Sequence, residues 1–361
     1  NGSDIKSDQQ LFRHLKQRDG IPSASVKDPT TGKQIFDVNE QFTCMIQQWK
    51  KIFDMHEHDP PKWDNFIQKY GQFEPGVHGA CANPLTGEQL WTRAKKLKED
   101  TAAGADGWKP HELKFIPRSA WDLRARVLAL SLEIGEYPEC YYTVNTHAIP
   151  KKNKGNAPLD HRLLAIFSAL YPLEAGAFFD KLVPWLQELL HPDVIGALPN
   201  REGLEIAWDA QAFLEHAHMY GLPGVLSTYD FKKYFDSFDH DFVYEMMKHV
   251  GMPAELAKLT HHLYKNMRRV LTKGKALSQP FSAYNGVGQR DILSLIPALV
   301  LVSWQFKMLD ILHPGVEKGA YFDDRNFRGT CEQLTKLDAD IHEFDKAAGH
   351  ATQPDKTEFV A

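Results

Sequence analysis

The sequence predicts a mixed α/β (α+β) protein in which helices back one side of a small antiparallel sheet. An apolar stretch that begins at Val225 ends in Asp230, as a buried strand does when it delivers a polar side chain to the end of a sheet. Two adjacent carboxylates, Asp323 and Asp324, lie between aromatic residues, which is typical of the turn of a hairpin. With 361 residues, 43% of them hydrophobic, the chain can bury a large core divided between two or three subdomains.

The N-terminal part begins with a polar stretch rich in His, Pro and Gly, and we interpret residues 1–85 as an N-terminal connector. Its one amphipathic segment, residues 38–53, predicts a helix because its large apolar residues recur at helical spacing. The pattern beyond it predicts, in order, a helix over 87–97, a helix over 121–134 with one apolar face (Leu123, Val127, Leu130, Ile134), a strand over 143–150, and one or two buried helices over 163–190, interrupted at Pro172 and Pro184.

The C-terminal half alternates between helices and short strands. Helical periodicity or a long apolar pattern predicts helices over residues 204–219, 242–250, 255–264, 292–312 and 331–347. Strands are expected over residues 225–230, over 269–272 and 281–284 on either side of a Lys-Gly-Lys turn, and over 321–329 as a hairpin. The succession of strand, helix, helix, hairpin and helix gives the helix-backed sheet of the predicted fold.

Composition and charge limit the classes of protein. The net charge of −5 argues against nucleic-acid binding over the whole surface, but residues 93–98, 151–154 and 265–275 form three basic clusters. They are either solvated faces or the lining of a phosphate track. No run of 18 apolar residues is present, so we expect no membrane span.

The ends of the chain and its cysteines indicate where the protein works. The chain starts at Asn1 without a charged-then-apolar leader, which predicts a fragment of a longer intracellular protein, in the nucleus or cytoplasm. The four cysteines are far apart, which excludes a local zinc knuckle and predicts reduced thiols with no disulfides: Cys44, Cys81, Cys140 and Cys331. The sequence leaves the oligomeric state open.

Asp230, Asp323 and Asp324 carry the functional hypothesis. Neighbouring carboxylates repel each other, so a fold that gathers three of them needs a divalent cation to neutralise them. Two Mg2+ ions held by carboxylates are the usual apparatus for nucleotidyl transfer. Two simpler interpretations remain, a solvated turn for the Asp-Asp pair and a helix N-cap for Asp230.

Six short segments match, in order, the motifs of one protein family. The segments are Ala103-Gly104-Ala105-Asp106-Gly107-Trp108 for Pro-Gly-x-Asp-Gly, residues 147–152 with 160–162 for two fingers strands, residues 230–237 for Asp-Phe-x-Lys-Ala-Phe-Asp-Ser, residues 286–294 for Gly-Val-x-Gln-Gly-Asp-Pro-Leu-Ser, residues 321–324 for Tyr-x-Asp-Asp, and residues 348–350 with 355–358 for a segment that ends in Lys-Thr. Together they resemble the reverse transcriptase domain of non-LTR (LINE-type) retroelements, over roughly residues 85–361.

This resemblance implies a right-hand polymerase with fingers over residues 86–222 and a palm over residues 223–361 that ends before the thumb. The implied reaction is two-metal transfer of dNTPs onto the 3′-hydroxyl of a DNA primer paired with an RNA template, with Mg2+ (or Mn2+) as cofactor. Two rival functions are an RNA-directed RNA polymerase, which usually carries Gly-Asp-Asp, and an inactive palm remnant that only binds RNA.

The resemblance also assigns the metal ligands. Asp230 and Asp323 would bridge both ions, the backbone carbonyl of Phe231 would complete one coordination sphere, and Asp324 would support the site.

Four further residues would bind substrates. Lys151 and Arg162 would hold the triphosphate, Phe235 would lie beneath the sugar and exclude a 2′-hydroxyl, and Gln289 would touch the nucleotide or the template. One departure stands out, because the glycine that follows this glutamine in the family is Arg290 here. With the thumb missing as well, the sequence predicts weak or undetectable processive synthesis.

Overall fold

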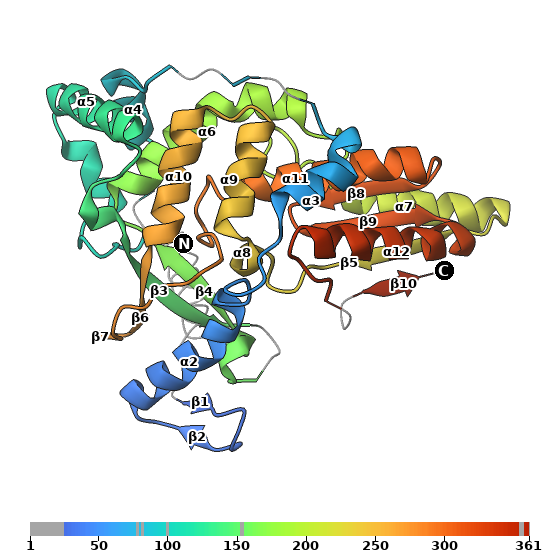
Figure 1. The fold of residues 1–361 in the computed structure, drawn as a ribbon, viewed down its shortest axis with the longest axis horizontal. Coiled ribbons are helices and arrows are strands. Elements are labelled where there is room, and N and C mark those ends of the chain that lie inside the picture. The colour runs from blue at the N-terminus through green and yellow to red at the C-terminus, as the bar shows by residue number, and fades with distance from the viewer. Residues whose placement is uncertain are drawn as a thin grey trace, which may run out of the picture.

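The computed structural model describes residues 25–76, 79–80, 83–98, 101–151, 155–353 and 357–360 (Figure 1). Cys81 and residues 152–154 and 355–356 lie outside this part. The helices are α2 (Val38–Phe53), α3 (Trp63–Tyr70), α4 (Gly87–Ala94), α5 (Arg118–Ile134), α6 (Leu170–Leu189), α7 (Gly203–Tyr220), α8 (Tyr234–Ser237), α9 (His240–His249), α10 (Ala254–Asn266), α11 (Leu295–Leu312) and α12 (Cys331–Ala347). The strands are β1 (Val26–Lys27), β2 (Gln34–Ile35), β3 (Thr143–Pro150), β4 (His161–Ile166), β5 (Val225–Tyr229), β6 (Arg268–Lys273), β7 (Ala276–Leu277), β8 (Glu317–Tyr321), β9 (Asp324–Gly329) and β10 (Glu358–Val360). This mixture of helices and small sheets confirms the predicted fold class.

Four antiparallel strands in the order β10-β5-β9-β8 form what we call the aspartate sheet, at the end of the molecule that holds the C-terminus (Figure 1). One face carries Tyr229, whose hydroxyl donates to Asp338 of α12 at 2.7 Å. The other face carries Gly319, where an added Cβ would lie 2.8 Å from Ile206 of α7. Helices therefore cover both faces, and the prediction that they back one side only is wrong.

A second sheet has the strand order β4-β3-β6-β7. Strands β3 and β4 are antiparallel, whereas β3 and β6 are parallel and are joined by a long crossover that contains the aspartate strand β5. Strand β7 pairs with β6 across the predicted Lys-Gly-Lys turn. The strand predicted over residues 281–284 is wrong, because only Phe281 bridges to β6, and the backbone N–H groups of Tyr284 and Asn285 donate to the carbonyl of Phe53 in α2.

The region predicted as buried helices, residues 163–190, begins as a strand. Leu163 and Ala165 alternate into the core and pair with β3, so these residues extend β4. Helix α6 then runs through both prolines without a break. Pro172 lies in its first turn, where the missing N–H costs no hydrogen bond, and Pro184 is accommodated inside the helix. The predicted interruptions are therefore wrong.

Helix α11 forms the centre of the hydrophobic core. It is long and apolar enough to cross a membrane by length and composition, but 72% of it is buried inside the protein, as in a core helix that meets the same criteria. The indole N–H of Trp304, which is fully buried, donates to the carbonyl of Tyr70 at 2.9 Å. This hydrogen bond joins helices α3 and α11. Helix α11 lies on the side of the aspartate sheet that carries Tyr229.

Helix α5 is confirmed, but its apolar face does not lie in the core. The side chains that bury this helix lie on its other side: Trp121, Ala125 and Leu128. The four predicted face residues are exposed to solvent by 62%, 37%, 52% and 52%, in the order Leu123, Val127, Leu130 and Ile134. Apolar periodicity thus identified the helix and not its orientation.

The predicted connector contributes to the core around the candidate site. Helix α2 has the predicted bounds, and its fully buried Trp49 donates to the carbonyl of Pro158 at 3.0 Å. The carbonyl of Phe53, its last residue, accepts the N–H of Asn285 at 2.9 Å. The boundaries proposed for the three domains stay a prediction.

Candidate active site

Strand pairing brings the three predicted acidic residues to one end of the aspartate sheet. Strands β5 and β9 are antiparallel, with Tyr229 opposite Arg325. One position further along, Asp230 follows the end of β5 opposite Asp324, the first residue of β9. Asp323 lies in the two-residue turn that joins β8 to β9. The strand register therefore brings the three residues to one end of the same sheet, and a spacing that could hold a pair of cations stays a prediction.

The turn that carries Asp323 is held by a neighbouring segment. Its first residue, Phe322, has a φ of 58°, a backbone conformation that costs a bulky residue about 1 kcal/mol or more. The N–H of Ile195 donates to the carbonyl of Ala320 at 3.1 Å, which aligns residues 193–196 with β8. A Cβ added to Gly196 would lie 2.8 Å from the backbone nitrogen of Phe322, so only glycine allows this approach. Packing from outside the hairpin therefore fixes the strained turn.

A pocket of about 570 Å3 opens between α7 and the aspartate sheet, beside the acidic residues. Asp230 and Asp324 line it together with Asn326 and Glu358, opposite an apolar wall from α7 (Ile206, Ala207 and Ala210). Asn326 is only 8% exposed, and its Oδ1 accepts no hydrogen bond in the structure. Buried amide oxygens normally have a donor, so this orphaned oxygen beside carboxylates suits a site that receives a cation or a hydrogen-bond donor.

The donor set around this end of the sheet suits a hard divalent cation, which prefers carboxylate and carbonyl oxygens. Phe231 forms an antiparallel bridge with Thr352, and the hydrogen bonds of this bridge are made by the flanking residues Asp230 and Lys232. The carbonyl of Phe231 therefore points away from that bridge, toward the side of the hairpin turn.

The side chains themselves are not closed around a metal. Within the described part of the chain, no three His, Cys, Asp or Glu side chains are grouped as a metal site. The role of Asp230, Asp323 and Asp324 as metal ligands therefore stays a prediction.

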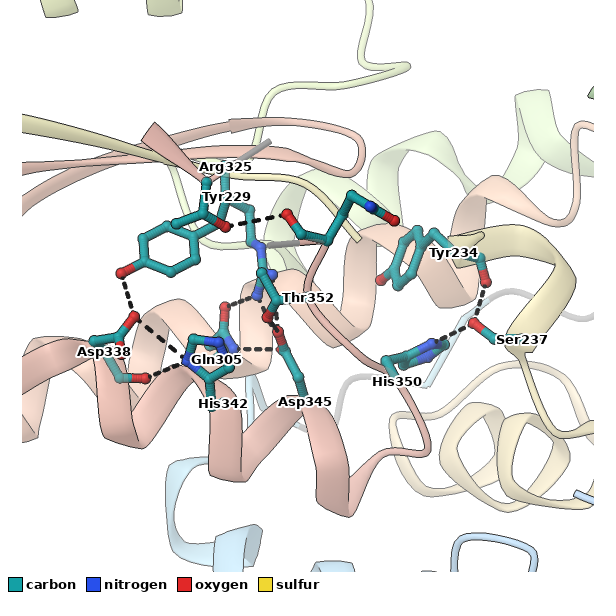
Figure 2. Close-up of polar contacts among 12 residues, drawn as sticks. Tyr229, Tyr234, Ser237, Gln305, Arg325, Asp338, His342, Asp345, His350 and Thr352 are labelled. Atoms are coloured by element: carbon teal, nitrogen blue, oxygen red, sulfur yellow. Dashed lines mark hydrogen bonds and ion pairs between the residues drawn. The ribbon is translucent and has the colours of Figure 1, made fainter. Parts of the chain in front are cut away.

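The opposite face of the same strands holds a buried ion pair. Arg325 is fully buried and donates to both carboxylate oxygens of Asp345 at 2.9 and 2.8 Å and to Oε1 of Gln305 at 2.5 Å (Figure 2). Its guanidinium carbon also lies 3.7 Å from the centre of the Phe231 ring. Since Arg325 and Phe231 each directly follow an acidic residue, this cluster ties both acidic backbones to α11 and α12.

A buried histidine completes the packing behind the site. The ring of His350 lies 5.5 Å from that of Phe231 and 4.9 Å from that of Tyr234. Its Nδ1 is 2.8 Å from Oγ of Ser237 (Figure 2). Burial lowers the pKa of His350 to about 3, and the nearby His56 contributes in the same direction. The segment that resembles the family motif at residues 348–350 therefore contributes a neutral packing group.

The two predicted triphosphate ligands lie on one face of the β3–β4 ladder. Arg162 is paired with Ile149, and Lys151 lies two residues further along, so the three side chains share a face. Arg162 is exposed. Burial lowers the pKa of Lys233, and the positive charge of Lys151 lowers it further, which places Lys151 close to the segment that follows Asp230. Triphosphate binding by Lys151 and Arg162 stays a prediction.

Gln289 has an internal partner that the sequence did not predict. Its side-chain amide donates to Oδ2 of Asp236 at 2.7 Å, and its carbonyl accepts the N–H of Ala165 in β4 at 3.1 Å. Asp236 is buried, which raises the pKa of its carboxyl, while the charges of Lys233 and Arg269 oppose the rise. The loop over residues 286–294 is thereby attached to β4 of the second sheet and to α8, which follows the aspartate strand β5, and contact of Gln289 with a nucleotide stays a prediction.

Phe235 lies in the short helix α8, which Lys233 starts with a φ of 57°. Its ring is half-buried and packs against Tyr234 with the ring centres 5.7 Å apart. Its carbonyl accepts the N–H of Val287 at 2.8 Å. The position of Phe235 is thus fixed by the same loop that carries Gln289.

Two aspartates within the matched motifs have structural partners. Asp106 accepts hydrogen bonds from the hydroxyl of Ser168 at 2.7 Å and the N–H of Ala169 at 2.9 Å, just before α6. Asp291 accepts the hydroxyls of Tyr171 at 2.7 Å and Tyr264 at 2.5 Å in the core. Sequence reasoning missed these roles, although both residues lie in segments that it singled out.

Arg290, the departure from the family pattern, has a φ of 80°, a conformation that glycine adopts readily and arginine does not. We expect Arg290→Gly to raise the free energy of unfolding by about 0.5–1 kcal/mol, because relief of backbone strain exceeds the added entropy of the unfolded chain. Urea denaturation measures this change. Ala197→Gly, at a φ of 58°, should shift stability in the same direction. A less stable Arg290→Gly protein would mean that contacts of the arginine side chain outweigh the strain.

No protein-family model matches this chain. The chain is similar to the retrovirus-related Pol polyprotein from type-2 retrotransposable element R2DM of Drosophila melanogaster, with 24% identity over 219 residues that cover 58% of this chain and 20% of that protein. It is also similar to the transposon TX1 uncharacterized 149 kDa protein of Xenopus laevis, with 23% identity over 254 residues that cover 67% of this chain and 19% of that protein. The chain spans about a fifth of the length of these relatives. Among solved structures, telomerase from Candida tropicalis in complex with a TWJ fragment of telomeric RNA is 14% identical, with a TM-score of 0.46, covering 68% of this chain and 45% of that one.

Proposed function

We propose that this chain, which is related to the polyproteins of non-LTR retrotransposons, is a reverse transcriptase domain that extends a DNA primer on an RNA template. The observation that carries the proposal is the strand register that pairs Tyr229 with Arg325, so that Asp230 and Asp324 follow and precede this pair at one end of the sheet, with Asp323 in the adjoining turn. Carboxylates far apart in the sequence are thereby collected where one sheet ends, as two-metal nucleotidyl transfer requires.

The residues around the sheet end would divide the work of phosphoryl transfer. Asp230, Asp323 and the carbonyl of Phe231 would hold the metal ions, and Asp324 would support them. Bound Mg2+, or Mn2+, would lower the pKa of the primer 3′-hydroxyl and neutralise charge on the triphosphate. The backbones that carry these groups would be kept in register by the buried Arg325 behind them.

The β3–β4 ladder, helix α8 and the loop over residues 286–294 would position the substrates. The planar guanidinium of Arg162 would bind triphosphate oxygens in pairs, and Lys151 would add a point charge on the same face of the β3–β4 ladder. The ring of Phe235 would occupy the space that a 2′-hydroxyl needs, which favours dNTPs. Gln289 would hold the loop over residues 286–294 against Asp236 and so keep Phe235 in place.

Primer extension on a gel tests the function. We expect Mg2+-dependent addition of a few deoxynucleotides to a DNA primer on an RNA template. Extension only with ribonucleotides would favour an RNA-directed RNA polymerase. Retention of RNA by a folded protein without any extension, in Mg2+ or Mn2+, would favour an RNA-binding remnant.

Phe235→Ala tests the sugar selectivity in the same assay. We expect incorporation of ribonucleotides relative to deoxynucleotides to rise by roughly 10–100-fold, because the discrimination exerted by one steric contact is of this size. Phe115→Ala, at a ring that is 81% exposed, serves as the matched control and should leave the ratio unchanged. An unchanged ratio in Phe235→Ala would remove Phe235 from the sugar site.

A further inference from the structure

Helix α5 exposes an apolar stripe with the spacing of a coiled-coil seam. Leu123, Val127, Leu130 and Ile134 follow one another at intervals of four, three and four residues, the interval pattern of the apolar positions of a heptad. All four are between 37% and 62% exposed. An exposed apolar patch of this kind is typical of an interaction surface, and the heptad intervals suit a second helix.

The location of α5 makes this stripe accessible. The helix lies at the end of the molecule opposite the aspartate sheet (Figure 1). Its inner side is already occupied, because Trp121 and Leu128 are buried, each about 1% exposed. Arg124, on the flank that faces the protein, is bound to Glu174 and donates to the hydroxyl of Tyr141 at 2.7 Å. The stripe itself is therefore open to a partner, whereas the flank that carries Arg124 is not.

The charges on the other flank of the stripe, where Glu133 lies at a pocket of about 340 Å3 that also borders Lys181 and Glu255, are self-complementary. Arg126 and Glu133 lie seven residues apart, on the same side of the stripe, and both are exposed. Neither forms an ion pair with another residue in the part of the chain that the structure describes. In an antiparallel pair of identical helices, equivalent flanks face each other. Arg126 of one copy would then meet Glu133 of the other, and the two-fold axis would generate the same pair a second time.

We propose that α5 pairs with α5 of a second copy of this chain, as a short antiparallel two-helix seam. The seam is limited to a helix of 17 residues, about 25 Å long, so the interface belongs to the small class, below about 1,200 Å2 in total, and the dimer is weak. Since the aspartate sheet lies at the far end of each molecule, pairing leaves both candidate active sites open to nucleic acid.

Sedimentation velocity over a series of protein concentrations tests the dimer. The unaltered protein should shift from monomer to dimer as its concentration rises, and Leu130→Glu should remain monomeric with an unchanged melting temperature, because residue 130 is exposed. Trp208→Glu is the matched control: it places the same charge on another exposed apolar residue, 72% exposed on α7, and should leave the dimer intact. A protein that stays monomeric at all concentrations, or a Leu130→Glu dimer as strong as the unaltered one, would overturn the proposal.

Charge exchange tests the antiparallel arrangement. Arg126→Glu and Glu133→Arg should each weaken the homodimer by about tenfold, since each places like charges opposite each other twice. An equimolar mixture of the two variants should recover dimers, because every pair then joins opposite charges again. Dimerisation that is equally weak in the mixture would exclude this antiparallel arrangement.

Discussion

Asp230→Asn and Asp323→Asn are each expected to lower the rate of primer extension by about a thousandfold or more. Metal ions contribute several kcal/mol to the stabilisation of a transition state, and each 1.4 kcal/mol is a factor of ten in rate. An asparagine keeps the size of the side chain but removes the charge that would hold the cation. Asp324→Asn should have a smaller effect, because the proposed site uses Asp324 as a support and not as a shared ligand.

Three measurements separate loss of chemistry from loss of structure. Mg2+ or Mn2+ should raise the melting temperature of the unaltered protein, and Asp323→Asn should remove that rise. RNA retention should be the same in both proteins. Asp209→Asn, the matched control on the exposed surface of α7, should change neither extension nor the response to metal. Full activity of Asp323→Asn would contradict a metal site at this sheet end.

Arg325→Leu is expected to lower the free energy of unfolding by about 3–5 kcal/mol. The substitution leaves the carboxylate of Asp345 buried without its partner, which is the costly outcome for an ion pair that is 0% and 1% exposed. The double variant Arg325→Leu/Asp345→Leu should recover most of this loss, because it removes both charges at once. Urea denaturation of the two proteins gives both values.

The control for the ion pair is a pair on the surface. Arg201→Leu breaks the contact with Glu205, whose two side chains are 39% and 41% exposed, and should cost less than about 1 kcal/mol. If Arg325→Leu were no more costly than Arg201→Leu, the buried pair would not hold the two acidic strands in register.

Local patterns predicted most of the elements, because their signals lie within a few residues. The helix over residues 38–53 and the strand over residues 143–150 have the predicted bounds. The hairpin at the two aspartates also formed as predicted, since a short loop between two strands is a local property, although its turn residues are Phe322 and Asp323 and Asp324 begins β9. Pairing between distant strands has no such local signal, and the parallel contact of β3 with β6 was therefore not predicted.

The sequence also did not predict which side of a helix packs against the rest of the protein. The apolar stripe of α5 has the periodicity of a core face, yet the smaller and aromatic residues of the opposite side are the ones that pack inward. Periodicity reports that one side of a helix is apolar, and it does not say whether that side meets the rest of the chain. The burial of Asp345 could not be predicted either, because a charged residue of a helix such as α12 is normally expected at the surface. Its buried partner, Arg325, is recognised only in the structure.

The candidate site was predicted from motif order, and its supporting residues were not. Asp230, Asp323 and Asp324 could be singled out because neighbouring carboxylates repel each other, so a fold that gathers them indicates a bound cation. The partner of Gln289, Asp236, belongs to the motif matched over residues 230–237, but a motif does not show which distant residue its side chain contacts, so this hydrogen bond emerged only from the structure.

The Arg325–Asp345 pair also constrains how this sequence can change over generations. Either charge alone in the interior is harmful, while both together, or neither, leave the protein folded. A lineage that lost one member would pass through a poorly folded intermediate before the second substitution restored it. Positions 325 and 345 should therefore covary: sequences that descend from this chain should keep both residues or replace both. An arginine next to the acidic residues is then retained because its loss alone is harmful.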